Sequence, residues 1–217
     1  RISQPDIIGK HHYEVFPEMP DKWKNIHQQV LAGAIMNADR DPFIRENGET
    51  DWVRWECRPW YEADGSIGGM ILYSENVNEQ IQHENEIREL NSRLEILIDS
   101  IKELSSAHTV EAVSQIATQS SRKLVGSDGA TFIIKDGENC FYLGENTVMP
   151  LWAGKRFPMS DCISGWVMSA HEPAVIEDIY TDSRVPIDLY RTTYVKSLIM
   201  VPVNISEPVG AIGNYWK

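Results

Sequence analysis

Basic side chains are scarce in this sequence. Its 217 residues carry 20 lysines and arginines against 32 aspartates and glutamates, which gives a net charge of −12. Such a chain repels the phosphates of nucleic acids and of anionic membranes, so we expect no nucleic-acid partner. No apolar run approaches the roughly 20 residues that cross a bilayer. We therefore expect no membrane contact in this part of the protein.

Cysteines are few and isolated. Cys57, Cys140 and Cys162 lie far apart and form no CxxC pair, which excludes a closed disulfide framework and a zinc knuckle. We predict reduced, buried thiols, as in cytoplasmic proteins. Residues 1–4 contain neither an initiator methionine nor the start of a hydrophobic leader. We therefore expect a cytoplasmic piece of a longer protein.

Catalytic and metal-binding motifs are also missing. The sequence has no HExxH, GxGxxG, GxxxxGKS or GxSxG segment, so we expect no catalysis by this chain itself. The histidines lie too far apart in sequence to predict a metal site. With 42% hydrophobic residues, the composition is that of a folded chain with a core.

The first third of the chain predicts a short helix and a three-stranded meander. Trp23, Ile26, Val30 and Leu31 recur at helical spacing before Gly33. Two dipeptides that favour tight hairpin turns, residues 47–48 (Asn-Gly) and 64–65 (Asp-Gly), then separate three strand-like runs.

Alternation along the second strand predicts a core face and a polar face. Val53, Trp55, Cys57 and Tyr61 form the apolar set. We predict that the tryptophans of this strand are core and interface residues and do not form a cofactor-binding site. The third strand, residues 67–73, is apolar at nearly every position, so we expect cover on both of its faces.

The middle of the chain predicts one long helix. Between residues 77 and 104 there is neither glycine nor proline, and charged residues are frequent. Six apolar residues recur there at alternating steps of three and four: Ile87, Leu90, Leu94, Leu97, Ile101 and Leu104. This is the a/d pattern of a coiled coil, so we predict that residues 79–107 pair two copies of the chain as a parallel homodimer. The alternative is that the stripe packs on its own domain.

The last part of the chain predicts a mixed α+β module. Thr109 can cap a helix that ends at Gly126, and residues 136–137 (Asp-Gly) predict a hairpin. Ser160 is the expected N-cap of a helix over residues 161–170. Strands are predicted over residues 174–176, 197–203 and 209–216, so sheet and helices alternate on one chain.

Two groups of motifs resemble known sensor families. The segments WVRWECRPW (52–60), DGSIGG (64–69) and ENVNE (75–79) resemble the C-terminal half of a PAS domain. The segments DCISGWV (161–167), EDIYTDSRVP (177–186), KSLIMVPV (196–203) and PVGAIG (208–213) look like a GAF domain. Asn76 stands where PAS domains usually have an aspartate that pairs with a strand arginine.

The resemblance implies a division into three parts. Residues 1–78 are the C-terminal part of a PAS-like domain with a partial antiparallel sheet, and residues 79–107 are a coiled-coil signalling helix. Residues 108–217 are a GAF-like antiparallel sheet with flanking helices, incomplete at its C-terminus. The fold class is thus α+β.

The same resemblance implies the sensory part of a signal-transduction receptor. A sensor histidine kinase is the favoured parent, although His83 and Glu84 only faintly echo a phosphoacceptor site and no ATP-binding lobe occurs in the sequence. A diguanylate cyclase and a transcriptional regulator are alternative parents. An interaction scaffold that dimerises without binding a ligand is the alternative from another class.

A small-molecule pocket in the GAF-like module is predicted from its aromatic and arginine side chains. The candidate lining residues are Trp152, Phe157, Trp166, Tyr180, Arg184, Tyr190, Arg191 and Tyr194. In the alternative interpretation the aromatic residues are core and the arginines face water. Residues 188–194, where related photoreceptors attach a bilin, contain no cysteine, so a covalent bilin is not expected. The resemblance leaves any cofactor unknown.

Overall fold

The computed structural model describes residues 8–17, 19–45 and 47–217. Residues 1–4, on which the expectation of a longer protein rests, lie outside this range. Two compact units divide the chain, one up to Ile87 and one from Arg88 onwards, so the division falls inside a helix. Each unit combines helices with an antiparallel sheet, which confirms the predicted α+β class.

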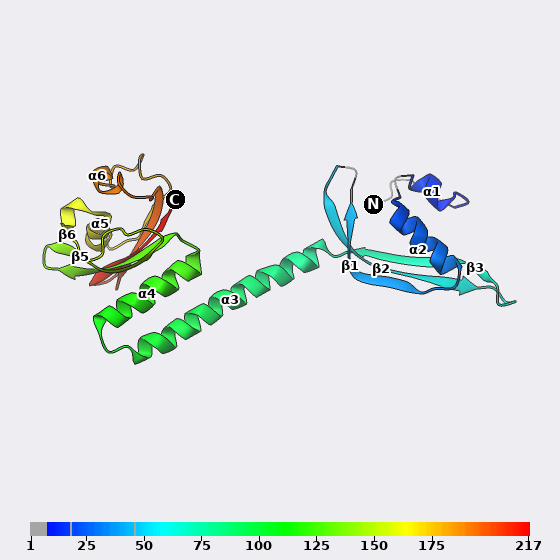
Figure 1. The fold of residues 1–217 in the computed structure, drawn as a ribbon, viewed down its shortest axis with the longest axis horizontal. Coiled ribbons are helices and arrows are strands. Elements are labelled where there is room, and N and C mark those ends of the chain that lie inside the picture. Colours follow the sequence, from blue (N-terminus) through cyan, green and yellow to red (C-terminus); the bar gives the residue numbers. More distant parts are fainter. Residues whose placement is uncertain (1–7, 18, 46) are drawn as a thin grey trace. The chain divides into compact units, whose positions relative to one another are not determined.

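The first unit places two helices beside a three-stranded meander (Figure 1). The helices are α1 (His12–Val15) and α2 (Asp21–Leu31), and the strands are β1 (Met36–Ile44), β2 (Thr50–Tyr61) and β3 (Ile67–Asn76), in the order β1-β2-β3. Gly48 and Gly65 have φ angles of 83° and 85°, a region that glycine adopts at little cost. Both predicted hairpin turns are therefore confirmed.

The core of this unit lies between α2 and β2. Trp23, Ile26 and Val30 are buried on one side of α2 and pack with Trp55 and Cys57 of β2. Leu31, which was predicted for the same helix face, is exposed, since consecutive helical residues point about 100° apart.

The pleat of β2 follows the predicted alternation except at its end. Val53 is half-buried and Trp55 and Cys57 are buried, but Tyr61 is exposed. The β2–β3 pairing shifts register between Trp60 and Tyr61. The residue left without a partner is Gly68 of β3, so the alternation of β2 itself continues. Tyr61 is the last residue of β2, next to the hairpin turn, and its assignment to the core is wrong.

Strand β3 is covered on one face by the described residues of this chain, and not on both faces as predicted. Met70 packs on the core, whereas Ile71 and Tyr73 are exposed. Near the start of β3 the Trp60 side chain lies over Gly68 and Gly69. A Cβ atom would come within 2.3 Å of the Trp60 ring at Gly68 and within 2.6 Å of it at Gly69.

Helix α3 (Asn78–Ser106) forms as predicted and is anchored to the sheet at its start. Val77 is buried, and its N–H donates to the Trp52 carbonyl oxygen at 2.8 Å. The six seam residues Ile87, Leu90, Leu94, Leu97, Ile101 and Leu104 are 37–62% exposed. The described residues of this chain therefore do not bury the stripe, which argues against packing on its own domain.

The second unit is built on a six-stranded antiparallel sheet with the order β6-β5-β4-β9-β8-β7. Its strands are β4 (Gly129–Asp136), β5 (Asn139–Thr147), β6 (Arg156–Pro158), β7 (Ala174–Ile176), β8 (Ser197–Val203) and β9 (Gly210–Trp216). Its helices are α4 (Val110–Val125), the 3₁₀ turn η1 (Met159–Asp161), α5 (Ile163–Ala170) and α6 (Ile187–Tyr190). Figure 1 shows α4 along one face of this sheet.

The strand alternation separates two layers of packing in this unit. Asn214 of β9 donates to Ser121 of α4, whereas its neighbour Tyr215 is fully buried among the core residues that surround α5. Consecutive strand residues point to opposite faces, so α4 and α5 cover different faces.

The helix ends of the second unit follow the prediction in part. Thr109 caps α4 by accepting a hydrogen bond from the Ala112 N–H at 3.1 Å, and Gly126 ends the helix with a φ of 64°. The predicted cap at Ser160 is wrong, because Ser160 lies in the 3₁₀ turn η1 and Cys162 is the N-cap of α5.

Candidate functional site

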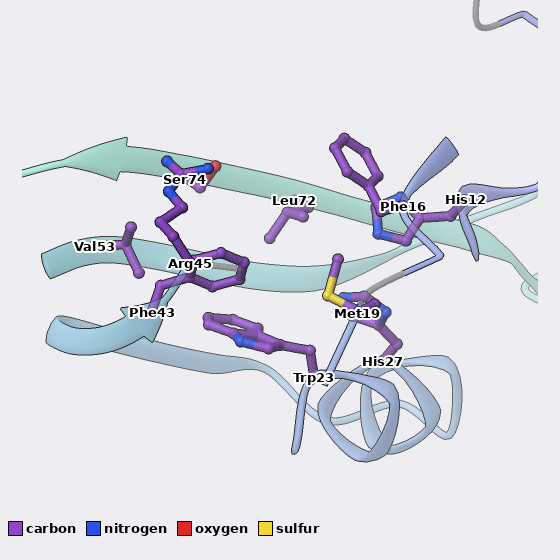
Figure 2. Close-up of a pocket in the computed structure, with 10 residues that line it drawn as sticks. All are labelled: His12, Phe16, Met19, Trp23, His27, Phe43, Arg45, Val53, Leu72 and Ser74. Carbon is purple, nitrogen blue, oxygen red and sulfur yellow. The ribbon is translucent and has the colours of Figure 1, made fainter. Parts of the chain in front are cut away.

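A cavity of about 230 Å³ lies in the first unit between its helical segment and its sheet (Figure 2). Apolar side chains form most of the lining. The lining residues are His12, Phe16, Met19, Trp23, His27, Phe43, Arg45, Val53, Leu72 and Ser74.

Local structure explains which side chains reach the cavity. Trp23 and His27 are four residues apart on α2, so they project on the same face of the helix. Leu72 and Ser74 are two residues apart on β3, so both point toward the same side of the sheet. In the view of Figure 2 the two histidines lie toward one end of the cavity and Arg45 and Ser74 toward the other.

The histidine end contains two ring nitrogens without a partner. The ring centroids of His12 and His27 are 5.1 Å apart, with the rings nearly perpendicular. His27 is only 2% exposed, and its Nδ1 lies 3.0 Å from the Tyr13 hydroxyl. The Nε2 atoms of both histidines are buried and have no hydrogen-bond partner among the described residues.

Both imidazoles favour the neutral form. Burial lowers the pKa of His12 below its usual value, and the neighbouring His11 lowers it further. The pKa of His27 is lowered by burial and then by His12. Desolvation disfavours the charged form of a base, and a nearby positive charge has the same effect.

At the other end, Arg45 is held in place by an acidic partner. Its Nε donates to Asp51 Oδ2 at 2.5 Å, and its guanidinium carbon lies 5.3 Å from the Phe43 ring centroid. The hydrogen bond from Arg45 is the main cause that lowers the pKa of Asp51. Arg45 is thus a cation whose charge is already paired.

Asp51 also links this end of the cavity to helix α3. Asn78, the first residue of α3, donates from Nδ2 to Asp51 Oδ1 at 2.8 Å and accepts the Trp52 N–H on its own Oδ1 at 2.7 Å. Asn76, which stands at the usual PAS aspartate position, accepts from the Asn78 N–H at 2.9 Å. The strand arginine Arg54 instead pairs with Glu75 at 3.6 Å and with Asp39 at 3.7 Å.

The sequence did not predict this cavity. His12 and His27 are far apart in the sequence, and only the fold brings their rings together. One signal was present: His27 lies four residues after Trp23, on the apolar face of a predicted helix. A histidine on such a face is either paired in the core or lines a site.

The predicted site residues of the second unit fall into two groups, of which one is packed aromatic core. Trp152 and Tyr190 are buried with ring centroids 4.9 Å apart, and Trp152 also lies 5.6 Å from Tyr142 and 5.6 Å from Tyr215. Phe157 joins this cluster through Tyr142 at 5.4 Å.

The other predicted residues lie at or near the surface of the second unit. Arg184 lies over the half-buried Trp166 ring at 4.5 Å and is paired with Asp182 at 2.6 Å. Arg191 is exposed and paired with Asp188 at 2.9 Å, and Tyr180 is 62% exposed.

Tyr194 combines burial with an unsatisfied group. Its hydroxyl is buried without a partner among the described residues, and burial raises its pKa to about 12. The pocket predicted around these eight residues stays a prediction.

The cysteines are free and buried, as predicted. Cys140 and Cys162 are neighbours: a hydrogen bond with Cys140 is the main cause that lowers the pKa of Cys162 to about 7, and the same contact raises the pKa of Cys140. Ser164 Oγ donates to Cys162 Sγ at 3.2 Å. Because both thiols lie inside the core, we interpret the pair as part of the packing of the second unit.

The described residues contain no group of three or more histidine, cysteine or acidic side chains that could hold a metal ion. None of their helices has both the length and the apolar character of a membrane span.

Comparison with known proteins supports a PAS module in the first unit. A family model described as PAS fold matches residues 1–82, which contain the cavity. No curated protein matches the chain.

Several solved structures are similar to part of the chain. The GAF domain of an Acinetobacter phosphoenolpyruvate-protein phosphotransferase is 15% identical, with a TM-score of 0.49, 58% of this chain covered and 77% of that chain. A free methionine-R-sulfoxide reductase from Neisseria meningitidis is 14% identical, with a TM-score of 0.49 and coverages of 57% and 72%. The chromophore binding domain of Stigmatella aurantiaca phytochrome P1 is 16% identical, with a TM-score of 0.46 and coverages of 82% and 64%.

The family match and the observed fold agree with the motifs in the sequence. Residues 1–82 match the PAS fold model, and the second unit has the antiparallel sheet with flanking helices that its GAF-like motifs predicted. The family match supports a PAS-type sensory module in the first unit.

Proposed function

We propose that this chain is the sensory part of a larger cytoplasmic receptor, in which helix α3 pairs two copies and carries a signal between the two units. A sensor histidine kinase is the favoured parent, with a diguanylate cyclase or a transcriptional regulator as alternatives. On this proposal the chain itself performs no catalysis, and the signal is transmitted to an output domain elsewhere in the protein.

The exposed seam on α3 carries the proposal. Burying one leucine or isoleucine side chain stabilises an assembly by about 1.5–3 kcal/mol, and six such residues stand exposed in a/d register on one helix. A second copy of the same helix presents the same stripe and is the simplest occupant.

Helix α4 contacts α3 on another face and leaves the seam open. Ser100, the one buried residue of α3, has its Oγ 2.7 Å from Ser120 Oγ of α4. Ser100 follows Leu97 by three positions but lies outside the a/d register, at the flanking g position. The helix therefore has two separate contact surfaces: the side with Ser100 packs on α4, and the seam is free for a partner.

The root of α3 supports a relay. Arg45 lines the cavity, Asp51 binds Arg45, and Asn78 at the start of α3 binds Asp51. A ligand whose binding moves Arg45 would change the partners of Asp51 and Asn78. Such a ligand shifts the helix only if it binds the two arrangements with different affinity.

Sedimentation of the purified chain tests the pairing. We expect a dimer, and we expect the exchange Leu97→Asp to weaken it at least about a hundredfold, because two carboxylates would be buried in an apolar seam. The matched control is Ser92→Asp, which adds the same charge to the exposed, opposite side of the helix. A dimer that survives Leu97→Asp, or a wild-type chain that is monomeric, contradicts the proposal.

A scaffold role is the second candidate, favoured by the second unit. The rings of Trp152, Tyr190 and Tyr215 pack closely on one another, as in a core built for stability. In a scaffold the dimer forms and no small molecule raises the unfolding temperature, whereas a sensor is stabilised by its ligand through mass action.

A further inference from the structure

We propose that the cavity of the first unit binds a neutral, single-ring aromatic molecule with a hydroxyl group, and that this hydroxyl lies between His12 and His27. The inference names the ligand class for the sensory role proposed above and rests on that role for its biological meaning. Three observations support it: the unsatisfied imidazoles, the size and lining of the cavity, and its charge.

The first observation is the unmet hydrogen-bonding capacity at one end of an apolar space. The Nε2 atoms of His12 and His27 are buried and have no partner among the described residues, and His27 as a whole is only 2% exposed. Buried polar groups are nearly always paired, and an unpaired one costs free energy that a ligand can recover. His27 has its other nitrogen occupied by the Tyr13 hydroxyl, so only Nε2 is available.

A hydroxyl suits this pair of nitrogens better than a pure donor or a pure acceptor. A neutral imidazole has one nitrogen that donates and one that accepts. A phenol is a stronger donor than acceptor, so Tyr13 is expected to donate to His27 Nδ1, which leaves Nε2–H of His27 as a donor. A hydroxyl group both donates and accepts, and it can therefore bridge the two histidines in either tautomer of His12.

The second observation is the size and lining of the cavity. An apolar protein cavity of about 150 Å³ holds benzene, so in proportion one of about 230 Å³ holds roughly nine non-hydrogen atoms. Trp23, Phe43 and Phe16 supply aromatic rings, and Met19 supplies a polarisable sulfur. Aromatic faces and thioether sulfur both make favourable contacts with an aromatic ring.

The third observation is that the cavity offers an anion no free cation. Arg45 is the one lysine or arginine among the lining residues, and it is already bonded to Asp51. The lowered pKa values of His12 and His27 keep both rings neutral near pH 7. Burying an unpaired carboxylate there would be costly, so a neutral ligand is favoured over an organic acid.

Three probes of similar size test the proposal by calorimetric titration of the whole chain. We expect 4-ethylphenol to bind about 3- to 10-fold more tightly than 4-ethyltoluene, which lacks the hydroxyl, and 4-methylbenzoate to bind most weakly. Tightest binding of the benzoate would overturn the neutral-ligand proposal in favour of a carboxylate site. Equal binding of the first two probes would overturn the role of the hydroxyl, and no binding by any probe would overturn the cavity as a binding site.

Two histidine variants locate the contact. His12→Phe keeps an aromatic ring but removes one of the two Nε2 atoms, so the preference for 4-ethylphenol over 4-ethyltoluene should shrink while 4-ethyltoluene still binds. His108→Phe removes an exposed histidine outside the cavity and should keep the preference. An unchanged preference in His12→Phe contradicts the assignment. If His12→Phe binds neither probe, His12→Gln, which keeps a hydrogen-bonding side chain, decides: restored binding of 4-ethylphenol supports the assignment, and no binding contradicts it.

The outcome is separate from that of the dimer proposal. Binding is measured by titration and pairing by sedimentation of the same sample. A chain that binds 4-ethylphenol but stays monomeric refutes the relay and keeps the ligand assignment, and a dimer that binds none of the probes does the reverse.

Discussion

The two units solve the same packing problem in different ways. In the second unit aromatic rings pack at 4.9–5.6 Å from one another, and the buried hydroxyls of Tyr142 and Tyr215 have partners in Ser164 and Thr131. In the first unit the tryptophan and histidine rings border a cavity, and two imidazole nitrogens stay unpaired. Closely packed rings contribute stability, whereas a cavity bordered by unpaired imidazole nitrogens is available to a ligand.

The largest expected effect breaks this comparison by opening the filled core. Trp152→Ala should reduce the free energy of unfolding of the second unit by about 3–5 kcal/mol, because a large buried side chain leaves a cavity among packed rings. Trp23→Ala should cost about 1–2 kcal/mol less, because part of the Trp23 side chain borders a cavity and makes no packing contact there.

Denaturant unfolding followed by the signals of each unit measures both changes. Tyr180→Ala is the control in the second unit, since this exposed side chain should change the free energy by no more than about 0.5 kcal/mol. An equal cost for Trp152→Ala and Trp23→Ala would remove the proposed difference between the two cores.

The neutral histidines predict a pH dependence confined to the first unit. The pKa values of His12 and His27 are lowered in the folded chain, so between pH 7.5 and 5.5 the unfolded chain, whose histidines titrate at about 6.5, binds more protons than the folded chain. Stability then rises with pH, and the unfolding temperature of the first unit should fall as the pH drops through about 6.5.

Two comparisons sharpen this prediction. His12→Phe removes one of the two groups, so the same measurement should give a shallower slope for the first unit. In the second unit Arg184 lowers the pKa of Asp182, and the stability that this pair contributes is lost only as the pH falls below about 4. A first unit whose stability is flat between pH 7.5 and 5.5 would show that its histidines are not held neutral.

The smallest expected effect concerns the link between the cavity and α3. Asp51→Asn should lower the free energy of unfolding of the first unit by about 0.5–1 kcal/mol, because Arg45 is largely exposed and surface ion pairs contribute little. The better readout is the pairing itself, since Asn78 loses a charged partner at the first turn of α3. Asp21→Asn, in an exposed pair with Lys24, is the control and should leave the dimer unchanged by sedimentation.

Sequence patterns predicted the regular elements because their physical causes are local. The seam from Ile87 to Leu104, the Thr109 cap and the glycine turns depend on residues a few positions apart. The cavity depends on distant residues: the pairing of His12 with His27 arises only when α1 and α2 fold against each other.

Two predictions are wrong because they depend on contacts that are not local in the sequence. The apolar composition of β3 predicted cover on both faces, but composition does not say whether the cover comes from the same chain, and Ile71 and Tyr73 are exposed. Simple alternation predicts Tyr61 as a core residue, but Tyr61 ends β2 next to the hairpin turn and is exposed. Predicting either would require knowledge of which elements pack on each face of the sheet.

The indole of Trp60 over Gly68 and Gly69 has a consequence for how the sequence can vary. Any side chain at either glycine would enter space that the indole now occupies. The three positions are therefore coupled, so that a larger residue at 68 or 69 requires the Trp60 indole to move or a smaller residue at 60. Among natural variants, a larger side chain at position 68 or 69 should therefore occur together with a smaller one at position 60.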